Sequence, residues 1–216
     1  MKVVVTAGPS YEPIDAVRRL TNFSTGELGV RLANQLAKAG FEVFCLRGIA
    51  ATYAGALENC CHLPFSTNDD LLAQLTSLSG AHEIAALFHA AALCDFKMKR
   101  VEDADGRALD SPKIDSTGGA LTLHLEPAPK VIGQLRALFP RATLVGWKYE
   151  LNGTRQDALV RAWRQIESNR TDACVLNGQA WGSGFAFCSP PKRVNDLRDK
   201  AELACFLADW LKERVR

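Results

Sequence analysis

The fold is decided by residues 2–29, which read KVVVTAGPSYEPIDAVRRLTNFSTGELG. The stretch begins with an apolar, strand-like run and continues through the small residues Thr6, Ala7 and Gly8. A polar segment follows, and the Ser-Thr-Gly of residues 24–26 opens a helical pattern. A strand that leads through a small-residue turn to a helix start directs free backbone N–H groups and the positive helix end at an anionic ligand. We therefore predict an anion-binding corner here, with the rest of the chain as its scaffold.

Length and charge bound the class of protein. The 216 residues suffice for a single domain over residues 1–216. The net charge of +2 gives no sign of a broad nucleic-acid or membrane surface, so neither partner is expected. The chain starts directly on a strand, without a basic and apolar leader, and its longest apolar run, residues 84–94, is too short to span a bilayer. A cytoplasmic location is the resulting expectation.

Cysteine and histidine are expected to be structural. The seven cysteines are an odd number, and four of them lie in apolar runs, which favours reduced core residues (Cys45, Cys94, Cys174 and Cys205). The four histidines are scattered without the spacing of metal ligands (His62, His82, His89 and His124). No metal site made by protein ligands is predicted.

Apolar periodicity predicts an α/β protein. Near-continuous apolar runs alternate with helical patterns, which is typical of a Rossmann-like, doubly wound and mainly parallel sheet with helices on both faces. The expected strands are 3–5, 41–46, 59–63, 84–90, 121–125, 143–146, 172–176 and a short antiparallel 185–188, and the expected helices are 25–39, 67–78, 131–139, 154–168 and 197–214. Ser24 or Thr25 is expected to cap the first helix.

One segment does not fit this alternation. Residues 95–119, DFKMKRVEDADGRALDSPKIDSTGG, are rich in charge and have almost no apolar periodicity. An irregular stretch of this length inside a domain is usually either a functional lid or disordered. We interpret it as a long active-site flap, followed by an edge-type strand at 121–125.

The first loop is not a dinucleotide fingerprint. A Rossmann cofactor site needs G-x-G-x-x-G directly after the first strand and an acid at the end of the second. Here Gly8 is followed by Pro9, and the second strand ends at Arg47. What remains is a long loop in which Arg18 and Asn22 precede the helix start and could serve a phosphate or carboxylate. Alternatively, the arginine is solvated and the loop only caps a helix.

Residues 6–29 resemble the opening of the phosphopantothenate–cysteine ligase family, also called phosphopantothenoylcysteine synthetase, whose pattern is roughly TAGGTxEPIDxVRxIxNxSSGxxG. Four later stretches agree with the family in order and spacing: AAALCD at 90–95, PKI at 112–114, VGWKYE at 145–150 and NRTD…VLN at 169–177. The resemblance covers nearly the whole chain.

The resemblance implies an enzyme of coenzyme A biosynthesis. The family joins the carboxylate of 4′-phosphopantothenate to the amine of cysteine through an acyl-nucleotide, releasing pyrophosphate and a nucleoside monophosphate. It uses CTP or ATP, and Mg²⁺ accompanies the triphosphate. The family is usually a homodimer. No flavin-binding decarboxylase domain precedes the matched region, so a stand-alone ligase is expected.

Site residues are implied by position in the matched motifs. The catalytic residues would be Asn22, Lys113 and Arg18; the nucleotide would contact Gly8, Ala91, Ala92, Asp95, Lys113, Pro129, Lys130, Val131, Ile132, Trp147, Arg164 and Ser168; the substrate would contact Arg18, Asn22, Ser24, Thr25, Gly26 and Asn177. Lys113 lies in the flap and would offset charge on the α-phosphate.

Departures from the family pattern cluster on the nucleotide side. Lys148 replaces a small residue, Ser168 stands where a phosphate-binding lysine is expected, and Gly178 replaces an aspartate. Lys148 or Arg170 could compensate for the lost lysine. The sequence leaves open CTP against ATP, and it leaves open two other classes: a Rossmann-like NAD(P)- or flavin-binding oxidoreductase, and a non-catalytic relative of the ligase.

Overall fold

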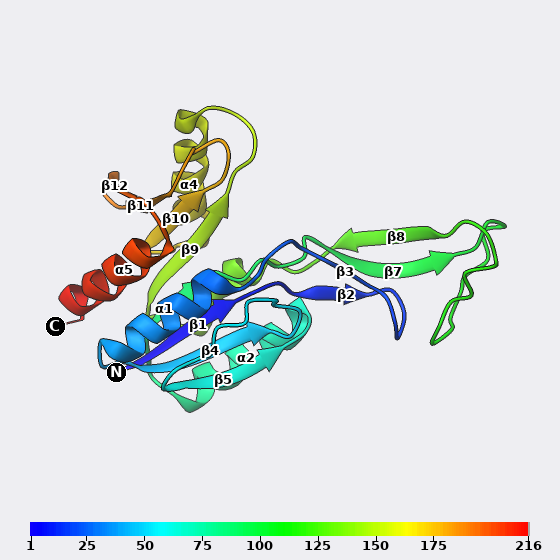
Figure 1. The fold of residues 1–216 in the computed structure, drawn as a ribbon, viewed down its shortest axis with the longest axis horizontal. Coiled ribbons are helices and arrows are strands. Elements are labelled where there is room, and N and C mark those ends of the chain that lie inside the picture. Colours follow the sequence, from blue (N-terminus) through cyan, green and yellow to red (C-terminus); the bar gives the residue numbers. More distant parts are fainter. Residues whose placement is uncertain (216) are drawn as a thin grey trace.

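The computed structural model describes residues 1–215 and contains an eight-stranded sheet in the order β12-β11-β10-β9-β6-β1-β4-β5 (Figure 1). The elements are β1 Lys2–Ala7, β2 Tyr11–Pro13, β3 Arg19–Thr21, α1 Glu27–Lys38, β4 Glu42–Gly48, β5 Cys60–Phe65, α2 Asn68–Ala81, β6 Ile84–His89, β7 Phe96–Glu102, β8 Thr122–Pro127, the 3₁₀ helix η1 Val131–Gln134, α3 Leu135–Leu138, β9 Thr143–Tyr149, α4 Arg155–Asn169, β10 Ala173–Asn177, β11 Phe185–Ser189, β12 Arg193–Leu197 and α5 Lys200–Arg214.

The predicted doubly wound sheet is confirmed. Six strands, β5 to β10 in the sheet order, run parallel, and only β11 and β12 are antiparallel additions at one edge. The central strands are apolar because both of their faces are covered; Val3, Val4 and Val5 of β1 are all fully buried, whereas the edge strands β5 and β12 are largely exposed. The chain winds from β1 first to β4 and β5 and then back past β1 to β6, so the order reverses between β1 and β6.

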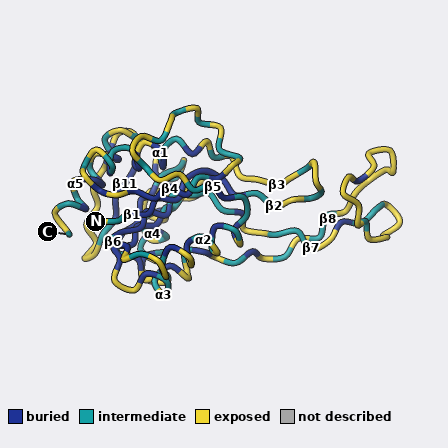
Figure 2. The backbone as a smooth tube through the Cα atoms, turned by 90° about the horizontal axis from the view of Figure 1, so that it is seen from below, coloured by how far each residue is buried: buried dark blue, intermediate teal, exposed yellow. Residues whose placement is uncertain are grey.

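Helices cover both faces of this sheet. Helices α1 and α5 share one apolar layer with the strands, in which Leu32, Leu36 and Leu207 are fully buried. Helices α2 and α3 bury Leu71, Leu75 and Leu135 on the opposite face. Helix α4 covers β10 and β11 through a smaller cluster. Figure 2 shows this interior in dark blue.

The starts of α2, α4 and α5 are capped by side chains. The Thr67 hydroxyl accepts a hydrogen bond from Asp70 N at the start of α2. At α4, Thr154 and Asp157 form a reciprocal capping box. The expected N-cap of α1 is wrong in position, because Gly26 occupies the N-cap in the left-handed conformation, with φ 79°. The Thr25 hydroxyl still accepts a hydrogen bond from Glu27 N at 3.3 Å, so it satisfies the first N–H group of the helix.

The interpretation of residues 95–119 as irregular is wrong in its first part. Residues 96–102 form β7, which pairs antiparallel with β8. The expected edge-type strand is thus part of a separate two-stranded ribbon. We call residues 96–127 the arm; in Figures 1 and 2 it projects from the sheet, mostly exposed, beside the β2–β3 hairpin. Strand β7 was not predicted from the sequence because it is rich in charge and neither face of the ribbon is deeply buried.

Smaller corrections concern the last third of the chain and one cysteine. The final helix begins at Lys200, not residue 197, because residues 193–197 form β12. The expected helix 131–139 is a 3₁₀ turn followed by a single α-turn. Cys205 is exposed on α5, whereas Cys45, Cys94 and Cys174 are buried as expected.

Close contact between α1 and β1 depends on Gly29. A Cβ atom added at Gly29 would lie 2.3 Å from Ala7 Cβ, well inside van der Waals contact. The helix start can approach the end of β1 only because this position has no side chain.

We expect Gly29→Ala to lower the free energy of unfolding by about 1–3 kcal/mol, because overpacking forces the helix away from the strand. Gly80→Ala, at an exposed position of α2, is the matched control, since a Cβ there meets nothing within 4 Å. This control should raise the free energy of unfolding by up to about 1 kcal/mol. Chemical denaturation of both variants measures the difference. Equal effects would contradict the close-packing argument.

Candidate active site

A cavity of about 1160 Å³ lies at the carboxyl ends of the parallel strands, where the strand order reverses. It is lined by the end of β1, residues 22–29, residues 89–95, residues 129–132, the end of β9 and one side of α4. In doubly wound sheets ligands bind in this position, outside the carboxyl ends and at the switch point. This cavity is the candidate active site.

Its floor is formed by two loops, residues 8–10 and 90–94, that are hydrogen-bonded to each other. Ala92 N donates to Gly8 O at 2.9 Å, and Ser10 N donates back to Ala92 O at 3.2 Å. The Ser10 hydroxyl donates to Asn68 Oδ1 at 2.7 Å and accepts from Cys94 N at 2.9 Å. Because Ser10 and Asn68 are buried, this network fixes the loop after β6.

Asn22 closes one side of the cavity by binding this loop. Its side-chain Nδ2 donates to Leu93 O at 2.8 Å and to Ala92 O at 3.3 Å. The NH₂ group that we expected to hold an acyl-phosphate is therefore directed at two carbonyl oxygens. The amide oxygen is the part of the side chain that these contacts leave available.

The start of α1 carries a group of ion pairs. Glu27 contacts Lys200 of α5 and also accepts from Arg31 Nε at 2.8 Å. These two hydrogen bonds, with Lys200 first, lower the pKa of Glu27. Glu27 and Lys200 both line the cavity, so residues from the first and last helices share its wall.

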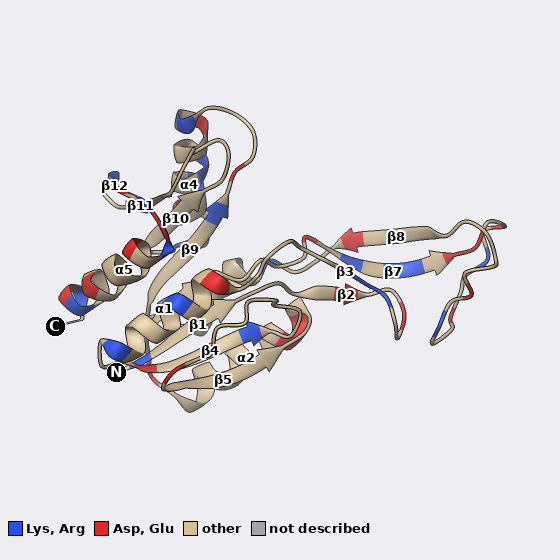
Figure 3. Ribbon diagram, in the orientation of Figure 1, with Lys and Arg blue, Asp and Glu red and all other residues tan. Residues whose placement is uncertain are grey.

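Cations gather on the opposite wall, along α4 and the end of β9 (blue in Figure 3). Glu150 joins two of them: Arg161 Nη1 lies 2.5 Å from its carboxylate and Lys148 Nζ lies 3.3 Å from it. Arg164 and Ser168 lie on the same side of α4, one and two turns further along. Arg164 is exposed towards the cavity with no ion pair among residues 1–215.

Most of the predicted site residues line this cavity. They are Gly8, Asn22, Ser24, Thr25, Gly26, Ala91, Ala92, Asp95, Pro129, Lys130, Val131, Ile132, Trp147, Arg164, Ser168 and Asn177. Asp95 contacts Lys130 across the base of the arm. The indole Nε1 of Trp147 is buried without a hydrogen-bond partner in the described chain. Of the two candidates to replace the missing lysine, Lys148 lines the cavity and Arg170 does not.

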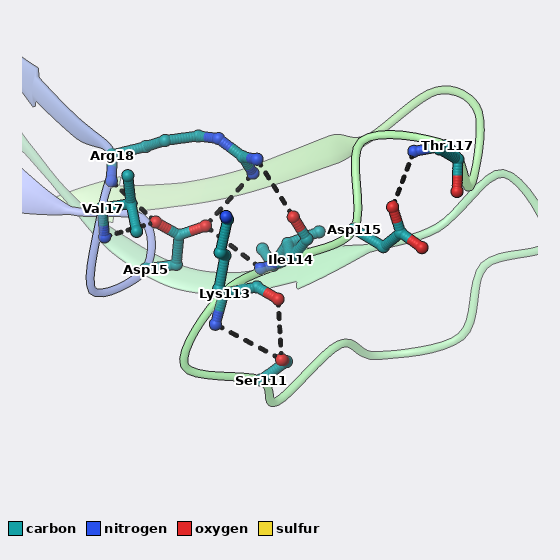
Figure 4. A network of polar contacts seen from close by, with 8 residues as sticks. All are labelled: Asp15, Val17, Arg18, Ser111, Lys113, Ile114, Asp115 and Thr117. Carbon is teal, nitrogen blue, oxygen red and sulfur yellow. Dashed lines mark hydrogen bonds and ion pairs between the residues drawn. The ribbon is translucent and has the colours of Figure 1, made fainter.

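Arg18 and Lys113 are the two predicted residues that lie elsewhere. Arg18 donates to Asp15 Oδ2 at 3.1 Å and to Ile114 O at 3.0 Å. The fully buried Asp15 carboxylate also accepts from Ile114 N at 3.2 Å (Figure 4). We call these contacts the clasp, since they join the β2–β3 hairpin to the arm next to Lys113. The structure thus brings Arg18 and Lys113 together, but outside the cavity of their own chain.

Several cavity residues were missed. Arg161 could have been found, because it shares the helical spacing i, i+3, i+7 with Arg164 and Ser168. Lys200 carries no local signal, since it reaches the cavity from the last helix. His89, which we expected to be structural, also lines the cavity.

The fold and this cavity define an α/β protein with a candidate site at the switch point of its sheet, and comparison places it in a family. Residues 1–205 match the model of the DNA/pantothenate metabolism flavoprotein C-terminal domain, so the chain belongs to that family.

Named relatives are coenzyme A biosynthesis bifunctional proteins CoaBC. The protein of Thermococcus kodakarensis is 33% identical over 183 residues, covering 84% of this chain and 42% of the relative. That of Bacillus subtilis is 30% identical over 185 residues, covering 85% and 42%. The chain thus spans about two-fifths of the length of these relatives.

Solved structures share the fold. The DNA/pantothenate metabolism flavoprotein of Streptococcus pneumoniae superposes with a TM-score of 0.87 at 24% identity, covering 99% of both chains. A mutant of Cab2 in complex with phosphopantothenate-cysteine superposes with a TM-score of 0.75 at 18% identity, covering 99% of this chain and 85% of that one. No helix in residues 1–215 has the length and apolarity needed to cross a membrane.

We expect Asp15→Ala to weaken the clasp, because Ile114 N loses its acceptor and Arg18 loses the carboxylate that orients it towards Ile114 O. Limited trypsin digestion should then cut after Lys113 several-fold faster than in the native chain. Asp115→Ala is the matched control, since Asp115 contacts only Thr117 (Figure 4). Equal cleavage of the two variants would contradict the clasp.

The same clasp has a pH dependence. The pKa of Asp15 is lowered, chiefly because Val17 N donates to its carboxylate. The stabilising contribution is therefore present at neutral pH and is lost as the pH falls through that lowered value.

Proposed function

We propose that the chain is a phosphopantothenate–cysteine ligase of coenzyme A biosynthesis. The observation that carries the proposal is the family match over residues 1–205, together with a switch-point cavity lined by residues from the motifs of that family. The names of the relatives, and the phosphopantothenate-cysteine bound to the Cab2 mutant, support the same substrate class.

The proposed reaction has two steps. The carboxylate of 4′-phosphopantothenate attacks the α-phosphate of CTP or ATP, forming an acyl-nucleotide and releasing pyrophosphate. The cysteine amine then attacks the acyl carbon, an amide bond forms, and the nucleoside monophosphate leaves with the bonding electrons. A phosphate leaving group makes the carboxylate a usable acyl electrophile, so the protein needs no nucleophile of its own and acts by positioning and charge neutralisation.

The two walls of the cavity divide this work. The triphosphate lies against Arg164, Lys148 and Lys130, whose charges offset those of the phosphates. The acyl-phosphate lies at the start of α1, where the remaining backbone N–H groups and the positive helix end favour an anion. Lys148 takes the place of the cation that Ser168 does not provide.

Magnesium fits this arrangement only as a partner of the triphosphate. The cavity carboxylates Asp95 and Glu27 are each already in contact with a lysine. The ion is therefore held mainly by phosphate oxygens, where it neutralises their charge during transfer.

We further propose that the arm serves the cavity of a second copy in a homodimer. Lys113 and Arg18 do not line the cavity of their own chain, although the family motif gives both a role at the site. Exposed apolar residues mark the arm and the cavity rim: Phe96 is 54% exposed, Leu125 43% and Phe23 fully exposed. Such surface is typical of a protein–protein contact.

The function is tested with the purified chain, 4′-phosphopantothenate, cysteine, Mg²⁺ and either CTP or ATP. Pyrophosphate release and a cysteine adduct are expected with one of the two nucleotides. Omitting cysteine should stop the reaction at the acyl-nucleotide. If no product forms with either CTP or ATP, the ligase function is refuted and a non-catalytic relative is favoured. Absorbance from bound flavin or NAD would favour the oxidoreductase.

The exchange of arms is tested by mixing two variants. Asn22→Asp should block amide formation in its own cavity, and Lys113→Gln should block activation in the cavity that its arm reaches. In a mixed dimer one cavity then has both native residues, so random mixing should restore about a quarter of native activity. No recovery despite mixed dimers, or a monomeric native chain, would contradict the proposal.

A further inference from the structure

His89 is the last residue of β6 and stands at the centre of the switch point. Only 7% of its surface is exposed, and it lines the cavity. It lies directly beside Thr6 in the parallel register of β6 and β1. None of the steps described above uses this side chain.

The hydrogen bonds around Thr6 determine which ring nitrogen of His89 carries a proton. Thr6 Oγ1 accepts from Ala91 N at 3.2 Å and lies 2.9 Å from His89 Nδ1. The Thr6 hydroxyl has no other acceptor among residues 1–215, so its hydrogen bonds within the protein only by donating to Nδ1. A neutral imidazole that accepts at Nδ1 carries its hydrogen at Nε2.

The ring is neutral at physiological pH. Burial lowers the pKa of His89 to about 4, since the interior disfavours the imidazolium form. The side chain is thus a fixed, uncharged donor.

That donor has no partner in the protein. Nε2 makes no hydrogen bond with any residue of the described range 1–215, and it is not one of the fully buried polar atoms that lack a partner, so it keeps access to the cavity that His89 lines. The cavity that His89 lines is where an acceptor can be supplied.

We propose that His89 Nε2–H binds an oxygen atom of the acyl-nucleotide, either a phosphoryl oxygen or the acyl oxygen, and that Thr6 is the positioning residue that fixes its tautomer. This rests on the proposed ligase function for the identity of the ligand. An uncharged donor suits this position, because it stabilises charge that develops on oxygen and does not form an ion pair with the attacking carboxylate.

The first test compares variants in the two half-reactions. His89→Leu removes the donor, whereas His89→Gln can place an amide N–H near the position of Nε2. We expect His89→Leu to reduce kcat/KM roughly ten-fold or more, as for loss of a hydrogen bond to a charged acceptor, and His89→Gln to recover much of it. A defect in pyrophosphate release identifies a phosphoryl oxygen, and a defect confined to amide formation identifies the acyl oxygen. Full activity of His89→Leu would overturn the proposal.

A second pair of variants separates binding from packing. Thr6→Val removes the hydroxyl that fixes the tautomer, and Thr6→Ser keeps it. Thr6→Val should lose more activity than Thr6→Ser. The thermal midpoints of both Thr6 variants should lie within a few degrees of that of His89→Gln. If activity instead follows the thermal midpoint across all four variants, His89 has only a packing role.

The tautomer itself is tested independently of catalysis by ¹⁵N NMR of histidine in the native, ligand-free chain. We expect Nε2 protonated and Nδ1 unprotonated at neutral pH, with the opposite in a fraction of Thr6→Val molecules. Adding 4′-phosphopantothenate with CTP or ATP should shift the Nε2–H signal. If Nδ1 is protonated, the inference about His89 is refuted even when the chain is an active ligase. If the expected tautomer is found but the chain is inactive, only the ligase function is refuted.

Discussion

The pairing of β1 with β6 continues past the ends of both strands, and the site depends on this continuation. Thr6 O still accepts from Ala90 N, and Gly8 O from Ala92 N, where the two strands would otherwise separate. The loop after β6 is thereby held against the loop after β1, and the start of α1 is held over both by Asn22. A cavity at a switch point normally lies between two loops that diverge. Here the loops after β1 and β6 are hydrogen-bonded to each other, and the cavity lies beyond this joined pair of loops.

Charge in this cavity is organised in pairs. Glu150 holds Arg161 and Lys148, and Glu27 holds Lys200. Pairing orients long side chains before a ligand arrives, which reduces the rotamer entropy lost on binding. It also keeps a group of cations close together without strong mutual repulsion. A highly charged ligand can then displace or share these partners.

Sequence reasoning reached the sheet and much of the site, and its failures have physical causes. Buried parallel strands carry an unmistakable apolar signal, so β1, β4, β6 and β9 were found. Strand β7 of the arm was missed, whereas its partner β8 was expected at 121–125, because β7 is rich in charge and has little burial to impose a pattern. Arg18 and Lys113 were expected in the cavity but lie outside it, because sequence cannot tell whether a projecting segment serves its own chain or another. Lys200 was missed because only tertiary folding brings α5 to α1.

The contact between Glu27 and Lys200 has a consequence for synthesis on the ribosome. The anion-accepting end of α1 is among the first parts of the chain to emerge, yet the wall that completes it belongs to α5, about 170 positions later. A partly synthesised chain that lacks α5 therefore also lacks Lys200, so this wall of the cavity forms only after the last helix has been made.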